Sequence, residues 1–248
     1  MTDSIPRPGA VALVTGASSG IGAAIAAALG AIGCRVICGG RRLSKLKAVA
    51  EAIGSNGLAI ELDVDSNRSV DSLTERLPAD WREVEILVNN AGHDKGGRSR
   101  FDEGTMAEWE SIIQTNVIGL IRVTRALIPG MIARDLGHVV NIGSISGFRP
   151  YATGTLYAGA KHAVHGFSES LRLDFKNTGI RVTEILPGMV RTGFAEARWQ
   201  DPKRAAKFYD DFGECLTPED VARTVAFAVQ QPRHVVISQL VVVPYTQG

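Results

Sequence analysis

The chain has 248 residues, of which 45% are hydrophobic, and a formal net charge of +1. This length and apolar content suit one large α/β domain, and the absence of a basic stripe or tail argues against nucleic acid and anionic membranes as partners. We find neither an apolar run of the ~18 residues that a membrane span needs nor a signal-peptide pattern. Cys34, Cys38 and Cys215 form no disulfide framework or metal-spaced cluster, so a reducing, cytoplasmic location is predicted.

Short β-branched runs alternate with longer helical segments from residue 10 onward, as a parallel sheet with crossover helices requires. Strands are predicted at 11–15, 35–38, 58–62, 86–89, 138–142, 182–186 and 239–243. Helices are predicted near 21–32, 42–53, 67–77, 105–133, 156–177 and 218–230. This pattern predicts a single-domain, Rossmann-like, doubly wound α/β fold over residues 1–248, with helices on both faces of a seven-stranded parallel sheet. Residues 188–217 are expected to be irregular and to act as a lid.

A glycine-rich turn follows the first predicted strand and precedes an apolar helix, in the sequence Thr15-Gly16-Ala17-Ser18-Ser19-Gly20-Ile21-Gly22. Open α/β sheets bind a dinucleotide pyrophosphate at this position, through free backbone N–H groups and the positive end of the helix. The spacing is not G-x-G-x-x-G, but it still permits a tight turn and a close backbone approach. We therefore predict a dinucleotide site at Gly16, Ser18, Ser19, Gly20, Ile21 and Gly22. A glycine-rich turn without a ligand is the competing interpretation.

The second predicted strand is followed by Gly39-Gly40-Arg41-Arg42. An NAD site needs an acidic residue here for the ribose 2′-hydroxyl, and none is present. Two guanidinium groups suit a 2′-phosphate through charge-assisted hydrogen bonds, so Arg41 and Arg42 favour NADP(H). The alternative is that one arginine only lies at a solvated helix start.

Tyr157 and Lys161 are four residues apart in a predicted helix, so both side chains lie on one face. A phenol with an unperturbed pKa of about 10 becomes a useful acid or base near neutral pH when an ammonium group lowers that pKa. Ser144 follows the strand at 138–142, at the sheet edge where ligands collect, and Ser146 is a competing hydroxyl. Asn116 lies on the inward face of the long predicted helix, where a buried amide needs partners.

In this order, the motifs resemble those of the short-chain dehydrogenase/reductase family over nearly the whole chain, including Asn89-Asn90-Ala91-Gly92. The resemblance implies hydride transfer between NADP(H) and a carbonyl carbon, with Tyr157 as acid or base, Ser144 orienting the oxygen and Lys161 holding the ribose. The resemblance also implies that Ser144, and not Ser146, is the catalytic serine. It implies that Asn116 holds a water relay to Lys161. It also implies cofactor contacts at Asp63, Val64, Asn90, Ala91, Gly92, Pro187, Gly188, Val190 and Thr192, as well as pairing into a homodimer or homotetramer.

The expected surroundings of the substrate are cationic, because His93, Lys95 and Arg98 follow the Asn-Asn-Ala-Gly turn and Arg191 begins the predicted lid. Arg149, five residues after Ser144, is the preferred anion-binding residue, since guanidinium pairs well with carboxylate or sulfonate. Solvated loop charge is the competing interpretation. The segments 141–144, 149–152, 216–221 and 243–247 resemble the branch of NADP-dependent 3-hydroxy acid dehydrogenases, which includes malonic semialdehyde and serine dehydrogenases and related sulfoacetaldehyde reductases.

The sequence thus predicts an NADPH-dependent reductase of a short acidic aldehyde or ketone, or the reverse oxidation. A second hypothesis keeps the chemistry but makes the substrate a neutral or bulky carbonyl, such as a cyclic ketone or secondary metabolite. A third is a dinucleotide-sensing protein without turnover. No metal site is predicted, because His162 and His165 have no accompanying acidic or cysteine ligand in sequence.

Overall fold

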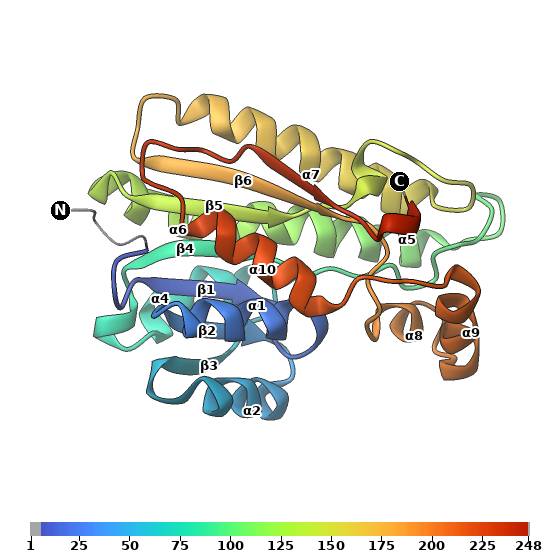
Figure 1. Ribbon diagram of the computed structural model, residues 1–248, viewed down its shortest axis with the longest axis horizontal. Coiled ribbons are helices and arrows are strands. Elements are labelled where there is room, and N and C mark those ends of the chain that lie inside the picture. Colours follow the sequence, from blue (N-terminus) through green and yellow to red (C-terminus); the bar gives the residue numbers. More distant parts are fainter. Residues whose placement is uncertain (1–5, 248) are drawn as a thin grey trace.

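Seven parallel strands form the central sheet of the computed structural model, which describes residues 6–247 (Figure 1). The order β3-β2-β1-β4-β5-β6-β7 confirms the predicted doubly wound fold. The order reverses between β1 and β4, and in such sheets ligands bind in the crevice beside the carboxyl ends of the strands at that point. The strands are β1 Val11–Thr15, β2 Arg35–Gly40, β3 Gly57–Glu61, β4 Val84–Asn89, β5 Gly137–Ile142, β6 Ile180–Pro187 and β7 Gln239–Val242.

Helices cover both faces of the sheet, because successive side chains of each buried strand point to opposite faces. In β1, Ala12 and Val14 pack with one cluster, whereas Val11 and Leu13 pack with the other. Burying one leucine or valine side chain contributes about 1.5–3 kcal/mol. The first face carries α1 Gly20–Ala31, α2 Leu43–Ile53 and α10 Pro218–Val229, and the second carries α3 Asn67–Asp71, α4 Leu73–Arg76, α6 Leu120–Arg134 and α7 Thr155–Asp174.

One helical stretch, Met106–Arg134, is long and apolar enough to cross a membrane by length and composition. It consists of α5 Met106–Ile113, a π-helical segment Gln114–Gly119, and α6. Its residues Val123, Leu127 and Met131 are buried against the sheet, so this is a core helix of the fold. A capping box between Thr105 and Glu108 fixes its start.

The segment 188–217 is not irregular, and this part of the prediction was wrong. It contains α8 Phe194–Trp199 and α9 Pro202–Phe212, which lie beyond the carboxyl ends of the strands (Figure 1). Asp201 caps α9 by accepting hydrogen bonds from the N–H groups of Lys203 and Arg204, and Pro202 occupies the first turn. Ala195, Ala205 and Tyr209 give the two helices a small apolar core of their own. The Asp-Pro pair was therefore a helix-start signal in the sequence.

Short 3-10 turns connect several elements, at Gly54–Asn56, Ala79–Trp81, Ile145–Gly147 and Tyr245–Gln247. The last of these places Gln247 beside the end of β6, where its side-chain Oε1 accepts a hydrogen bond from the N–H of Met189 at 2.8 Å. This contact holds the first residues of the 188–217 segment against the sheet edge.

Candidate active site

Ser144, Tyr157 and Lys161 converge at the carboxyl end of β5. Lys161 is buried on α7, and its Nζ donates a hydrogen bond to the carbonyl of Ile142 at 2.8 Å. The same Nζ lies 5.7 Å from the centroid of the Tyr157 ring. Ser144 is close enough to lower the pKa of Tyr157 through its side chain, and its Oγ accepts a hydrogen bond from the N–H of Ser146 at 3.1 Å. The structure therefore brings together three of the predicted groups, and Ser144 is the serine that contacts Tyr157.

The acid-base properties of this pair are set first by burial. Burial raises the pKa of Tyr157 well above its usual value, with smaller contributions from Asp94 and Tyr151, while Arg198 and Ser144 lower it. Burial also lowers the pKa of Lys161 to about 8, and the charge of Glu184 opposes this effect. The expected lowering of the Tyr157 pKa by Lys161 is not found, because burial dominates and raises this pKa.

Asn116 lies in the π-helical segment, a rare local geometry that is frequent at functional sites. Its amide nitrogen donates to the carbonyl of His93 at 2.7 Å and to that of Ile112 at 2.9 Å. Its Oδ1 is buried and makes no hydrogen bond within residues 6–247. This free acceptor fits the water-holding role that the family resemblance implies.

The glycine-rich turn between β1 and α1 forms a cradle that side chains would fill. Gly16 has a φ of +68° and Gly20 a φ of +55°, and a Cβ at Gly22 would collide with the carbonyl oxygen of Gly16. Ser19 is the N-cap of α1 but makes no side-chain capping bond. The first N–H groups of the helix are therefore available to donate hydrogen bonds to a ligand. The helix also lacks an acidic residue in its first turn. These features fit the pyrophosphate of a dinucleotide.

Arg42 connects the end of β2 to this cradle. Its guanidinium donates to Ser18 Oγ at 2.6 and 3.1 Å and to Ser19 Oγ at 2.8 Å. Arg41 is exposed beside it. The Arg42 guanidinium therefore stands at the cradle with an exposed arginine next to it in the chain, and a 2′-phosphate fits this arrangement better than a bare ribose hydroxyl does.

Other predicted cofactor residues line the same sheet edge. Asn90 Nδ2 donates to the carbonyl of Thr15 at 2.9 Å, and the Thr15 hydroxyl accepts from the N–H of Ala91 at 3.0 Å. A Cβ at Gly92 would collide with Asn116 Oδ1. At the end of β3, the N–H of Asp65 donates to Asp63 Oδ1 at 3.1 Å, and the neighbouring Val64 is buried.

The residues after β6 lie over the cradle. A Cβ built on Gly20 would lie 3.5 Å from the Thr192 side chain. The Tyr209 hydroxyl of α9 donates to the Thr192 carbonyl at 3.1 Å. The N–H of Gly188, which follows Pro187 at the strand end, donates to Val242 at 2.8 Å, and Val190 forms a β-bridge with Leu216. The 188–217 segment therefore reaches both the cradle and the catalytic helix.

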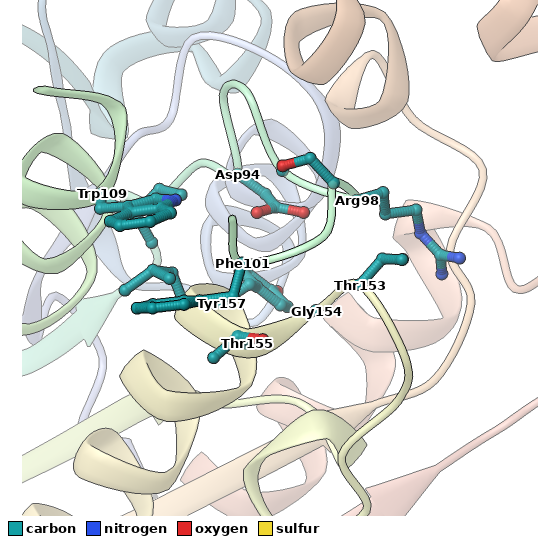
Figure 2. A pocket seen from close by; sticks show the side chains of 12 residues that line it. Asp94, Arg98, Phe101, Trp109, Thr153, Gly154, Thr155 and Tyr157 are labelled. Carbon is teal, nitrogen blue, oxygen red and sulfur yellow. The ribbon is translucent and has the colours of Figure 1, made fainter. Parts of the chain in front are cut away.

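A small cavity lies beside Tyr157, and Figure 2 shows the side chains around it. Its volume is about 10 Å³, roughly the space of one water molecule. The carboxylate of Asp94 is buried and pairs with Nε of Arg198, a buried residue of α8, at 2.7 Å. Charged and apolar groups thus share this space, whose lining includes Asp94, Arg98, Phe101, Trp109, Thr153 and Leu156.

Arg98 is the second guanidinium at this cavity. It lies between two aromatic rings, 4.6 Å from the centroid of Tyr151 and 4.7 Å from that of Phe208 on α9. Its Nε is buried and makes no hydrogen bond among the described residues. Burial lowers the pKa of this guanidinium. Asp94 projects into the space above α7, whereas the head of Arg98 lies at the far end, near Thr153 (Figure 2).

Of the cations that the sequence placed around the substrate, Arg98 lines this cavity, whereas His93, Lys95, Arg149 and Arg191 do not. Arg149 is exposed and stacks over Phe148 at 5.6 Å, and Lys95 is also exposed. Arg191 is half exposed and pairs with Asp210 at 3.0 Å. His93 is directed toward α5 and the π-helical segment, where its Nε2 lies 3.1 Å from both Ser111 Oγ and Thr115 Oγ1. A second guanidinium near the cavity is that of Arg198, which pairs with Asp94 and which the sequence patterns did not single out.

The histidines of α7 have other partners. His162 Nδ1 lies 2.8 Å from the carbonyl of Ala158, and His165 Nδ1 lies 2.7 Å from Glu184 Oε2. Among residues 6–247, no group of three or more histidine, cysteine and acidic side chains could hold a metal ion.

Comparisons with known proteins agree with this geometry. Residues 10–203 match the family described as short chain dehydrogenase. The chain belongs to the short-chain dehydrogenase family. A relative from Salmonella typhi, NADP-dependent 3-hydroxy acid dehydrogenase YdfG, is 41% identical over 240 residues, which cover 96% of each chain.

Two solved structures are similar over nearly the full length of this short-chain dehydrogenase. The closed form of serine dehydrogenase complexed with NADP+ has a TM-score of 0.93 and 40% identity, with 96% of each chain covered. Serine dehydrogenase from Escherichia coli has a TM-score of 0.84 and 37% identity, covering 96% of this chain and 99% of that one.

Proposed function

We propose that this protein is an NADP(H)-dependent oxidoreductase that reduces a short acidic aldehyde or ketone to the hydroxy acid or sulfonate, or catalyses the reverse. The observation that carries the substrate class is the charge balance beside Tyr157. The cavity and its rim hold two guanidinium groups, of Arg98 and Arg198, and one buried carboxylate, of Asp94. One positive charge is left over, and it belongs to Arg98.

The cofactor is NADP(H), and the protein supplies its cradle at Gly16, Gly20 and Gly22 and its 2′-phosphate partners at Arg41 and Arg42. When bound, the cofactor supplies or accepts the hydride. The YdfG relative is NADP-dependent by name, and the serine dehydrogenase structure contains NADP+. Both facts support the preference for NADP(H) that the paired arginines predict.

Tyr157 donates its proton to the carbonyl oxygen during reduction and takes it back from the alcohol during oxidation. Ser144, which already contacts Tyr157, donates a hydrogen bond to the same substrate oxygen and stabilises the charge that develops there. The Lys161 ammonium binds the ribose and supplies the positive charge that favours the tyrosinate. Asn116 Oδ1 accepts a hydrogen bond from a water that carries the proton onward.

Arg98 is suited to receive the acidic end of the substrate. Its guanidinium lies at the end of the cavity near Thr153, and Tyr157 borders the same cavity (Figure 2). A bound anion would accept a hydrogen bond from the buried Nε of Arg98. It would also offset the cost of burying the guanidinium charge. Arg98 also has a φ of +61°, in the left-handed region, which costs a residue other than glycine roughly 1–2 kcal/mol. Such strain is concentrated at functional sites.

The test measures NADPH and NADH oxidation with malonic semialdehyde, sulfoacetaldehyde and uncharged propanal. We expect high kcat/KM for an acidic aldehyde with NADPH. Equal or better turnover of propanal would leave the oxidoreductase standing and reject the acidic substrate, whereas cofactor binding without turnover of any carbonyl would favour the sensing protein.

We also propose that the enzyme is a cytoplasmic homodimer or homotetramer. Met106, Ile118, Ile121 and Ile132 are exposed along the Met106–Arg134 stretch, which also bears Asn116. An apolar helix face of this kind needs a partner. Light scattering on the purified protein should give the mass of two or four chains, and Ile121→Glu should lower it. A monomeric wild-type protein would contradict this assembly.

A further inference from the structure

A buried carboxylate that the proposed reaction does not use lies beneath the catalytic residues. Glu184 of β6 is 0% exposed, although ionisable side chains are almost never fully buried without a partner. The alternation along β6 places it on the same face as Val182, which packs under α6 and α7. Its Oε1 makes no hydrogen bond among the described residues.

Glu184 is directly next to the catalytic strand end. It pairs in register with Asn141 of β5, and a Cβ at Gly143 would collide with its Oε1. Gly143 lies between Ile142, whose carbonyl accepts from Lys161, and Ser144, which contacts Tyr157. The carboxylate therefore packs on the one residue that separates these two catalytic contacts.

His165 connects this carboxylate to solvent. Its Nδ1 lies 2.7 Å from Glu184 Oε2, and its side chain is 26% exposed. On the outer side, His165 Nε2 lies 3.8 Å from Glu169 Oε2, which is 51% exposed. His165 is one helical turn after Lys161, so both residues lie on the face of α7 that covers the sheet.

Charged and polar groups from three neighbouring segments surround Glu184. α7 contributes Lys161, His165 and Glu169, and Arg172 lies 3.8 Å from Glu169. β5 contributes Asn141 and Gly143, which are uncharged, and β7 contributes the Gln239 amide, 3.2 Å from His165 Nδ1. Burial raises the pKa of Glu184, and the charges of His165 and Lys161 oppose this effect. In the same way, the charge of Glu184 opposes the lowering of the Lys161 pKa by burial.

We propose that Glu184, which pairs with His165, is the buried counter-ion of Lys161 and a positioning residue that keeps this lysine in its ammonium form during catalysis. The inference rests on the proposed catalytic role of Lys161. The direction in which the loss of Glu184 would shift proton release from Lys161 follows from charge alone. Without the carboxylate, the ammonium loses a buried negative charge and releases its proton at lower pH.

The test is the pH dependence of carbonyl reduction by Glu184→Gln, which keeps the shape of the side chain and removes its charge. We expect the alkaline midpoint of kcat/KM to move to lower pH by about one unit. His165→Ala should shift it in the same direction, because an unpaired buried carboxylate takes up a proton. The double variant should shift no further than Glu184→Gln, since the two side chains act through one charge.

Glu169→Gln is the matched control, because it removes the same charge from the solvent side of His165, where charges are screened. It should keep the wild-type profile. A purely structural role for Glu184 would lower the melting temperature and leave the alkaline midpoint in place, and that result would overturn the inference. If Glu184→Gln does not fold, an unchanged midpoint in the half-exposed His165→Ala variant overturns it equally. An inactive wild-type protein would instead reject the proposed function.

Discussion

Replacing Arg98 by methionine tests the substrate assignment most directly. Methionine keeps an unbranched chain between the rings of Tyr151 and Phe208, which lie 4.6 and 4.7 Å from the guanidinium carbon, and removes the charge. A hydrogen bond to a charged group contributes about 1.5–3 kcal/mol. At 1.4 kcal/mol for each factor of ten, this predicts a loss of roughly 10- to 150-fold in kcat/KM for an acidic aldehyde.

The assay compares malonic semialdehyde or sulfoacetaldehyde with propanal for wild-type, Arg98→Met and Arg149→Met proteins. Propanal has no acid for Arg98 to bind, so its kcat/KM should change little. Arg149→Met makes the same chemical change at an exposed position outside the cavity and should leave all three substrates unaffected. An equal loss for propanal in Arg98→Met would show that Arg98 only supports the fold. A selective loss in Arg149→Met would return the anion site to Arg149.

Three further changes test the rest of the site. Tyr157→Phe should lower kcat by about 10²–10⁴-fold while NADPH still binds in a fluorescence titration, and retained turnover would reject the tyrosine as acid or base. Arg42→Ala should weaken NADPH binding by roughly 10- to 100-fold and leave NADH unchanged, because only the 2′-phosphate loses a charged partner; equal weakening of both would point to the Ser18 and Ser19 contacts instead. Arg198→Met leaves Asp94 buried and unpaired, which should cost about 3–5 kcal/mol in urea unfolding. Asp94→Asn with Arg198→Met should recover part of that loss, and additive losses would contradict the pairing.

The sequence by itself determined the sheet, the cofactor cradle and the catalytic helix. These features depend on local patterns: β-branched runs for the strands, glycines at the turn after β1, and the four-residue spacing of Tyr157 and Lys161. Strand boundaries differ by at most two residues from those predicted. The helices α8 and α9 were missed although Asp201-Pro202 signalled the second of them, because their small core depends on contacts with each other.

Only the tertiary structure decided which charges meet at the site. Asp94 and Arg198 are 104 positions apart in the chain, and His165 and Glu184 belong to different elements, so no spacing rule links either pair. Burial then decides the chemistry of each group: it lowers the pKa of Lys161 to about 8 and leaves the Nε of Arg98 without a partner. Arg149 and Arg191, which are equally cationic in sequence, are exposed to solvent, where charge is screened. Local sequence patterns specify elements, whereas the folding of distant segments onto one another determines which polar groups lose water and find a partner.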